Sequence, residues 1–522
     1  MDIKKAIGQL FVVGFQGKTM SEEVKRQIRE YHVGGVILFS QNIGSPEEVL
    51  ALTNALQKEA KEAGYERPLL IAADEENGTV KRLREGAGNY PGGMALSAIQ
   101  DTDYAYEIGK ATGDDLRLLG INWNYAPVLD VNINPKNPVI GVRSFGEDPE
   151  RVSEVGLASM KGLQDGGVAT STKHFPGHGD TNVDSHYALP VISHDVERIH
   201  EVELVPFKAA IAEGTDSIMT THIVFPALEP DPDRPATLSK NILTGLLREE
   251  LGYDGVIVTD ALEMKAIADT FGIANGAVEA INAGADSLII GHLADEQFKS
   301  LERVEEAVNN GEIEMSRITD SIERISKLKD KYTSWDDLDL NNTTVPAMFN
   351  SEEKQALTIA AYEKSVTVLR EGQPLERDMS ILLLQPKDER STIAEDITNE
   401  NYIIENILKQ YVDKIDVELI SSDLPEEQYK RILEKAGNFD RIIVGAMVAS
   451  EESRLVQLVN ELTAEYVVDY IGIKSPYIGQ WLNNTNFWIN TYEPSSIPVD
   501  IAIKALLGDI KPTGVSPVTL KV

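Results

Sequence analysis

Short apolar runs recur along the first two thirds of the chain, and longer helical patterns separate them. Most of these runs are apolar at successive positions, which is typical of strands buried on both faces of a parallel sheet. Ser45 and Pro46 predict the start of one of the intervening helices, as a capping residue and a first-turn proline. Repeated βα units over this length favour a closed TIM-type (β/α)8 barrel over an open sheet. About seven runs precede residue 335, at 34–39, 69–73, 121–126, 167–172, 217–221, 255–259 and 287–291.

The pattern changes near residue 335. The segment 335–346 lacks helical periodicity and is typical of a linker. A helical pattern follows at 351–366, and further apolar runs then alternate with helices, at 380–384, 416–420, 441–445 and 466–471. The sequence therefore predicts a barrel over 1–335, a linker over 336–350 and a second layered α/β domain, an αβα sandwich, over 351–522.

Composition narrows the class of partner. The 522 residues include 49 basic and 84 acidic side chains, for a net charge of −35. This balance argues against nucleic acid or an anionic membrane as the main partner and favours small molecules. The chain has no cysteine, which excludes disulfides, thiol nucleophiles and thiolate metal sites.

No segment approaches the ~18 apolar residues of a membrane helix. The first residues also lack the long apolar core of a signal peptide. We therefore expect a cytoplasmic protein, or a secreted one if a signal segment has been removed.

Charged residues follow several of the predicted strands. In a barrel, Asp74, Asp130, Lys173, His222 and Asp260 would converge on the carboxyl face, where barrel active sites are built. One aspartate after a strand is more often a helix N-cap, but several such groups together favour an active site.

The segment 171–190 carries three of the eight histidines and is too rich in glycine and proline for a helix. Three interpretations are open. His174 and His178 could bind zinc, although the intervening Pro-Gly excludes a helical i, i+4 pair. The histidines could instead be structural. The third interpretation is acid/base chemistry, in which Asp184 orients His186, because residues i and i+2 of an extended loop point the same way. Lys173, Asp180 and Asp184 stand among these histidines.

The loop, from Lys-His-Phe-Pro-Gly-His-Gly-Asp-Thr at 173–181 through Asp184-Ser-His186, resembles the signature of family 3 glycoside hydrolases, and more narrowly of their β-N-acetylglucosaminidases. Further segments agree with that family: 9–15, 34–39, 74–82, 126–130, 140–145 and 258–264. The similarity spans about 300 residues and continues more weakly to the C-terminus.

The resemblance implies Asp260 as nucleophile, His186 as general acid/base and Asp184 as its partner. It also implies sugar-binding roles for Asp74, Arg82, Arg143, Lys173 and His174. Glu75 and Glu76 are alternative proton donors, since they lie beside Asp74. Asn77 departs from the glycine pair of many relatives, and we expect it to reshape the loop beside the sugar.

The resemblance thus implies a retaining exo-β-N-acetylglucosaminidase acting on muropeptide-type or chitin-type oligosaccharides, with a place in peptidoglycan recycling. A phosphorylase of the same family and a non-catalytic sugar-binding protein are the alternatives. No metal or organic cofactor is implied. The expected partner is a small carbohydrate, with no nucleic acid or membrane, and the expected assembly is a monomer or homodimer.

Overall fold

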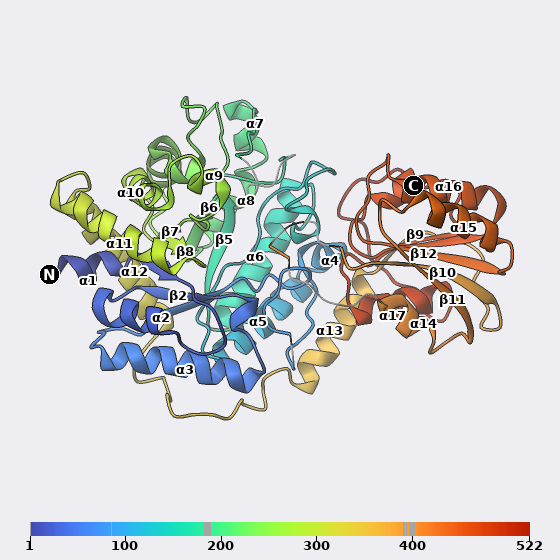
Figure 1. Cartoon of the computed structure of the whole chain (residues 1–522), viewed down its shortest axis with the longest axis horizontal. Helices are drawn as coiled ribbons and strands as arrows, with labels where there is room; N and C mark the ends of the chain where they lie inside the picture. Colours follow the sequence, from blue (N-terminus) through green and yellow to red (C-terminus); the bar gives the residue numbers. More distant parts are fainter. Residues whose placement is uncertain (1, 85, 182–188, 390–391, 393, 396–401) are drawn as a thin grey trace.

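The computed structural model describes residues 2–84, 86–181, 189–389, 392, 394–395 and 402–522. Two α/β units follow one another along the chain, as Figure 1 shows. No helix among the described residues is long and apolar enough to cross a membrane.

The first unit is an eight-stranded parallel barrel with the order β7-β6-β5-β4-β3-β2-β1-β8. A parallel bridge between Val258 and Ser287 links its two end strands and closes the ring. The predicted barrel is therefore confirmed. Its strands are β1 (Phe11–Val13), β2 (Gly35–Leu38), β3 (Leu70–Ala73), β4 (Trp123–Asn124), β5 (Ala169–Phe175), β6 (Ser217–Thr220), β7 (Val256–Val258) and β8 (Leu288–Ile290).

The prediction missed β1, which has only three residues and closely follows a helix of six residues. Every residue of β1 is buried. The predicted start of α3 is confirmed, since the Ser45 side chain accepts a hydrogen bond from the Glu48 backbone in a capping box.

Helices surround the barrel and bury their apolar faces against it. They are α1 (Ile3–Gly8), α2 (Glu22–Arg26) with its continuation Gln27–Tyr31, α3 (Pro46–Glu62), α4 (Gly93–Ala98), α5 (Asp103–Leu118), α6 (Pro149–Asp165), α7 (Val196–Glu201), α8 (Val205–Ala212), Asn241–Glu250, α9 (Lys265–Ala268), α10 (Ile273–Ala283), α11 (Ala294–Asn309) and α12 (Met315–Tyr332).

The second unit is a six-stranded sheet with the order β11-β10-β12-β13-β14-β9, in which only β9 runs antiparallel to its neighbour. Its strands are β9 (Thr367–Arg370), β10 (Ser380–Pro386), β11 (Lys414–Ile420), β12 (Arg441–Ala446), β13 (Val468–Gly472) and β14 (Phe487–Asn490). The prediction missed β9 and β14.

Helices cover both faces of this sheet, as Figure 1 shows, so the predicted sandwich is confirmed. Ile381 and Leu383 of β10 contribute to the core on one face, and Leu382 and Leu384 to the core on the other. The helices are α13 (Glu352–Ser365), α14 (Ile403–Leu408), α15 (Glu426–Ala436), α16 (Arg454–Glu465) and α17 (Ser496–Leu506).

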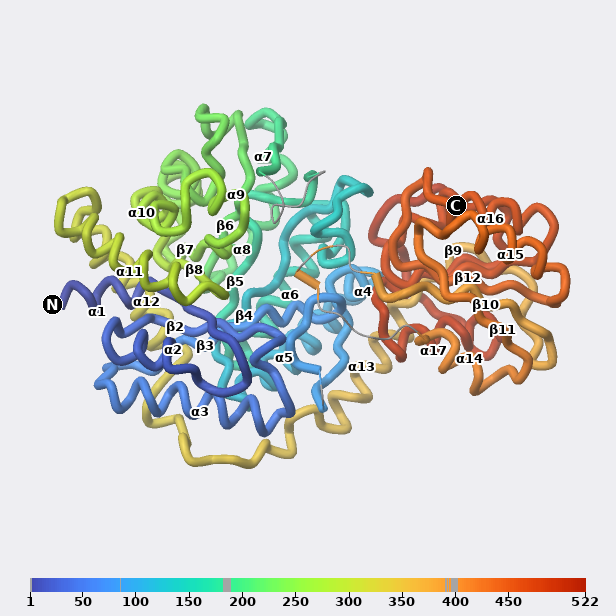
Figure 2. The backbone as a smooth tube through the Cα atoms, in the orientation of Figure 1, coloured from blue at the N-terminus to red at the C-terminus, as the bar shows by residue number. Residues whose placement is uncertain are grey.

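The connection between the units runs along the outside of the barrel, beside α3 and α5 (Figure 2). Asn54 of α3 donates to the Asn342 carbonyl, and Asp115 of α5 accepts from the backbone of Asn350. The second unit then packs beside the α4 side of the barrel. Its loops come close to the carboxyl ends of the barrel strands, where the candidate site lies.

Candidate active site

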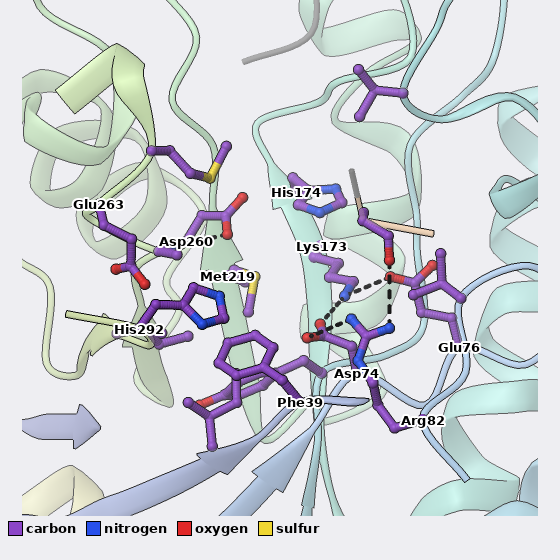
Figure 3. A pocket seen from close by; sticks show the side chains of 18 of the residues that line it. Phe39, Asp74, Glu76, Arg82, Lys173, His174, Met219, Asp260, Glu263 and His292 are labelled. Carbon is purple, nitrogen blue, oxygen red and sulfur yellow. Dashed lines mark hydrogen bonds and ion pairs between the residues drawn. The ribbon is translucent and has the colours of Figure 1, made fainter. Parts of the chain in front are cut away.

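A cavity of about 490 Å³ lies at the carboxyl ends of the barrel strands (Figure 3). Strands far apart in sequence each supply a wall residue: Phe39 after β2, Asp74 after β3, Lys173 and His174 within β5, Met219 within β6, Asp260 after β7 and His292 after β8. The structure thus brings together Asp74, Lys173, His174 and Asp260, as the sequence pattern predicts. Arg82 and Arg143 line the same cavity.

Lys173 joins two carboxylates on one wall. Its Nζ lies 2.8 Å from Oδ1 of Asp74 and 2.7 Å from Oε1 of Glu76. Burial lowers the pKa of Lys173, but the charges of Asp74 and Glu76 outweigh it and raise the pKa above its usual value. The lysine therefore stays an ammonium ion, a fixed donor beside a carboxylate acceptor.

Glu76 is held by two cations. Arg143 donates to both of its oxygens at 2.8 Å, and Lys173 adds a third contact. Burial would raise the pKa of Glu76, but the charges of Arg143 and Lys173 hold it well below its usual range. Glu76 is therefore ionised at neutral pH and poorly suited to donate a proton.

Glu75 holds the backbone of the segment that follows Asp74. It does not line the cavity, and its Oε2 accepts from the backbone N–H groups of Arg82 and Leu83 at 2.8 and 2.9 Å. Burial raises its pKa to about 7. Its bonds fix the position of Arg82, whose Nη2 lies 3.5 Å from Oδ2 of Asp74.

Asn77 has a left-handed backbone conformation in this segment. Its φ is +66°, and that of Gly78 is +60°. Asparagine tolerates this left-handed conformation better than most residues, so it can adopt a backbone that glycine usually supplies. Its Nδ2 donates to Thr112 at 3.0 Å, and it lies outside the lining of the large cavity.

His174 takes its orientation from Asp130. Its Nδ1 lies 2.7 Å from Oδ2 of Asp130, whose other oxygen accepts from the backbone N–H of His178 at 2.7 Å. Burial would raise the pKa of Asp130, but His174 beside it holds the pKa below its usual value. Asp130 therefore stays a buried acceptor that leaves Nε2 of His174 available to the cavity.

His178 also lines the cavity, and its Nδ1 lies 2.9 Å from the Thr181 hydroxyl. Burial, with the neighbouring His174, lowers the pKa of His178 to about 4. It is therefore neutral at physiological pH.

Asp130 and His222 do not face the cavity, contrary to the expectation that the charged residues after the strands converge there. Neither side chain lines it, and both are fully buried behind it. Nε2 of His222 donates to the Ala261 carbonyl at 2.9 Å, directly after Asp260. Asp130 and His222 therefore act through neighbours, since Asp130 orients His174 and His222 bonds the backbone beside Asp260.

The wall opposite Lys173 carries Asp260, Glu263 and His292 (Figure 3). Oδ1 of Asp260 accepts from the backbone N–H of Ala261 at 2.7 Å. Glu263 accepts from the Gly291 N–H at 2.6 Å through Oε1, while its buried Oε2 has no hydrogen-bond partner among the described residues. Burial raises the pKa of Glu263 to about 7. Sequence reasoning missed this residue, although it lies only three positions after Asp260.

Asp184 and His186 lie outside the described residues. On the near side of that segment, Gly179 packs against the backbone, since a Cβ placed on it would lie 1.7 Å from the Val131 carbonyl oxygen. Asp180 next to it accepts from Nε2 of His194 at 2.6 Å. These contacts fix Gly179 and Asp180, which precede that segment.

The second unit also reaches the cavity. Nη1 of Arg82 donates to the Ala394 carbonyl at 3.4 Å, and Ala394 lines the cavity. Sequence reasoning found no such residue, because nothing in the pattern around 394 signals a contact more than 300 positions away.

Among the described residues, no group of three histidine, cysteine, aspartate or glutamate side chains is arranged to hold a metal ion. His174 and His178 direct Nδ1 to Asp130 and to Thr181, respectively.

Residues 2–328 match the model of the glycosyl hydrolase family 3 N terminal domain. Beta-hexosaminidase A of Pseudoalteromonas piscicida is 39% identical over 401 residues, which cover 72% of this chain and 66% of that protein. A beta-hexosaminidase of Methylobacillus flagellatus is 36% identical over 280 residues, covering 52% of this chain and 78% of the relative. Among solved structures, the family 3 beta-N-acetylglucosaminidase from Paenibacillus sp. str. FPU-7 superposes with a TM-score of 0.91 at 37% identity, covering 100% of this chain and 99% of that one.

The family model thus matches more than half of the chain, and the solved relative has the same two units in the same order. The cavity lies at the face of the barrel where such enzymes carry their active sites. The chain belongs to the family 3 glycoside hydrolases.

Proposed function

We propose that this enzyme is a retaining exo-β-N-acetylglucosaminidase that hydrolyses terminal β-linked N-acetylglucosamine from muropeptide-type or chitin-type oligosaccharides. The β-hexosaminidase relatives and the Paenibacillus β-N-acetylglucosaminidase support this substrate. The cavity of about 490 Å³ supports it too, since it suits a ligand of small-molecule size and combines apolar walls with a few fixed polar groups.

The fixed charges suit a terminal sugar. In this proposal Asp74 accepts hydrogen bonds from sugar hydroxyls, while Lys173, Arg82 and His174 donate to sugar oxygens. Arg143 acts with Glu76 to hold Lys173 in place. Because these groups are already paired with one another, they need little reorganisation when the sugar binds.

Asp260 is the proposed nucleophile. Its carboxylate attacks C1 of the sugar, the bond between C1 and the leaving oxygen breaks, and His186 gives that oxygen its proton. His186, oriented by Asp184, then takes a proton from water, which attacks C1 and releases Asp260. A histidine replaces the usual second carboxylic acid in this scheme, and its ordinary pKa suits both proton transfers near neutral pH.

The observation that carries the proposal is the position of Asp260, across the cavity from the Asp74–Lys173 pair (Figure 3). A 5-fluoro glycosyl inhibitor of N-acetylglucosamine configuration tests it. Mass spectrometry should find the adduct on a peptide containing Asp260, and Asp260→Asn should lose turnover. Asp269→Asn, an exposed aspartate nine residues later, is the matched control. An adduct elsewhere, or normal turnover by Asp260→Asn, contradicts the assignment.

The phosphorylase alternative is not favoured, because the β-hexosaminidase relatives are hydrolases by name and are 36–39% identical to this chain. Product analysis with and without millimolar phosphate tests this directly. Hydrolysis predicts free N-acetylglucosamine in both conditions, whereas a phosphorylase would yield the sugar 1-phosphate. Release of a chromophore from an aryl N-acetylglucosaminide excludes a protein that only binds sugars.

A cytoplasmic location and a role in peptidoglycan recycling form the finer part of this proposal. Cell fractionation tests the location, and turnover of a muropeptide relative to chitobiose tests the role. The boundaries 1–335, 336–350 and 351–522 are proposed as the domain limits, and limited proteolysis within 336–350 tests them. The proposed assembly is a monomer or a homodimer, and sedimentation analysis distinguishes the two.

A further inference from the structure

A second cavity, of about 690 Å³, lies between the barrel and the second unit. The barrel contributes the segment 135–142, and the second unit contributes Tyr477, Trp481 and the segment 448–452. The proposed reaction does not use this space.

The second cavity adjoins the active-site cavity. Val139 lines both, and the next residues along the same loop lead to Arg143 of the active site. On the side of the second unit, Ala394 lines the first cavity and its neighbour Glu395 lines the second. A chain that leaves the first cavity on this side therefore enters the second one.

Its lining combines an aromatic surface with polar groups. Trp481 is partly buried, and Tyr477 is fixed by a hydrogen bond of 3.0 Å from Asn132. Ser422, Ser450 and Ser475 also line the cavity, and the side chains of Ser422 and Ser450 are hydrogen-bonded to Glu389 and Glu452, respectively. A flat aromatic ring packs well against the C–H face of a pyranose, and hydroxyl groups can pair with its oxygens.

The charges favour an uncharged ligand. Four glutamates and two lysines line the cavity: Glu389, Glu395, Glu451, Glu452, Lys136 and Lys474. Lys474 forms an ion pair with Glu395, which leaves three carboxylates facing one lysine. A phosphate or a free carboxylate on the ligand would be repelled here, whereas an N-acetylated sugar would not. Of the two proposed substrate types, this cavity therefore favours the chitin type over a muropeptide, whose peptide carries free carboxylates.

The cavity is preformed because the two units are packed firmly around it. Met94 and Val142 of the barrel form one apolar cluster with Tyr477 and Tyr492 of the second unit. Glu493 adds an interdomain bond by accepting from the Gly92 N–H at 3.2 Å. Beside Tyr477, a ligand would therefore meet a surface that is already assembled, which lowers the entropic cost of binding.

We infer that this second cavity binds the uncharged N-acetylated sugar residues that follow the cleaved bond, with Trp481 as the stacking platform. This inference rests on the proposed function, since it concerns the leaving part of the same substrate. The second unit would then recognise the oligosaccharide while the barrel carries out the cleavage.

Two kinds of variant test this. Trp481→Ala removes the platform and Trp481→Phe keeps a smaller one, while Ala449→Trp fills the cavity. Ala464→Trp, an exposed position on α16, is the control for an added tryptophan. Trp335→Phe is the control for a lost one, since Trp335 lines neither cavity and donates to the Tyr65 carbonyl. The substrates are an aryl N-acetylglucosaminide, whose leaving group is small, and chitotetraose.

For Trp481→Ala and Ala449→Trp, we expect kcat/KM on chitotetraose to fall roughly 5- to 10-fold relative to the aryl substrate, the usual size of one stacking contact. Trp481→Phe should lie in between, and both controls should keep the wild-type ratio. If the ratio stays unchanged in both test variants, the subsite is wrong while the activity stands. If the wild-type enzyme releases no N-acetylglucosamine from either substrate, the proposed function itself is wrong, and the subsite falls with it. Should Trp481→Ala lose both activities equally, Ala449→Trp decides, since it leaves the tryptophan in place.

Discussion

Arg143 donates two hydrogen bonds of 2.8 Å to the carboxylate of Glu76, and both side chains are almost fully buried. A planar guanidinium matches a carboxylate in this way, whereas a lysine ammonium offers only a point charge. Glu76 in turn contacts Lys173, so the pair fixes the donor beside Asp74. The geometry of this wall therefore depends on the shape of Arg143 as well as on its charge.

We expect Arg143→Lys to lower kcat/KM on an aryl N-acetylglucosaminide roughly 10- to 100-fold, because one charge-assisted hydrogen bond is lost and Lys173 shifts. Arg303→Lys is the control, since Arg303 donates to both oxygens of Glu312 on the surface, although through the single nitrogen Nη2. Steady-state kinetics measure both. Equal activity of the two variants would show that the buried pair has no role in holding the site.

The sequence predicted the barrel well because its buried parallel strands appear as continuous apolar runs. It missed β1, β9 and β14, which have three or four residues each. Length alone does not explain this, since the predicted strands β7 and β8 have only three residues. It also identified Asp74, Lys173, His174 and Asp260, since each lies at or just after the carboxyl end of a strand. Asp130 and His222 also follow strands, but their side chains are buried behind the cavity instead of lining it. Position after a strand does not distinguish these two cases, because the packing around each side chain decides whether it faces the cavity.

Glu263 should affect stability in a way that depends on pH. Its pKa in the folded chain is about 7, above the ordinary value of 4.5, so folding favours its protonated form. Between these two pH values the unfolded chain loses this proton first, and the stability of the wild-type protein falls as pH rises through the window. Glutamine carries no such proton.

Glu263→Gln should therefore unfold at a temperature about 5 °C higher than wild type at pH 8. This difference in unfolding temperature should shrink toward pH 4.5. Other buried glutamates cancel in this comparison because both proteins contain them. Thermal scans across pH measure it, with the exposed Glu302→Gln as control. We also expect kcat/KM to fall about 10-fold, since Oε2 is a buried acceptor at the cavity. A difference that does not change with pH would contradict the shifted pKa.

Gly179 lies in the histidine-rich segment 171–190 and packs closely against Val131. A Cβ at this position would lie 1.7 Å from the Val131 carbonyl oxygen, so Gly179→Ala must displace the loop backbone. A displacement of about 1 Å at a site can cost roughly 10²-fold in rate. We expect a loss of this size in kcat with a small change in unfolding temperature. Gly245→Ala, whose nearest neighbour would lie 3.9 Å away, should be close to wild type in both measurements.

The identity of the proton donor can be settled with leaving groups. Glu76 is held ionised by two cations, and Glu75 lies outside the cavity, so neither is well placed to protonate the leaving oxygen. His186, with Asp184 as its partner, remains our predicted donor. Removing a general acid typically costs ~10²–10⁴ in rate, and the cost is largest for poor leaving groups. We therefore expect His186→Ala to impair chitobiose hydrolysis much more than hydrolysis of an activated aryl glycoside. Asp184→Ala should show the same trend more weakly, because an unoriented imidazole donates less well.

Glu75→Gln should show no dependence on the leaving group, since its carboxylate holds a backbone turn. If the histidine variant loses both substrates equally and Glu75→Gln shows the leaving-group trend instead, then Glu75 supplies the proton and His186 only shapes the loop.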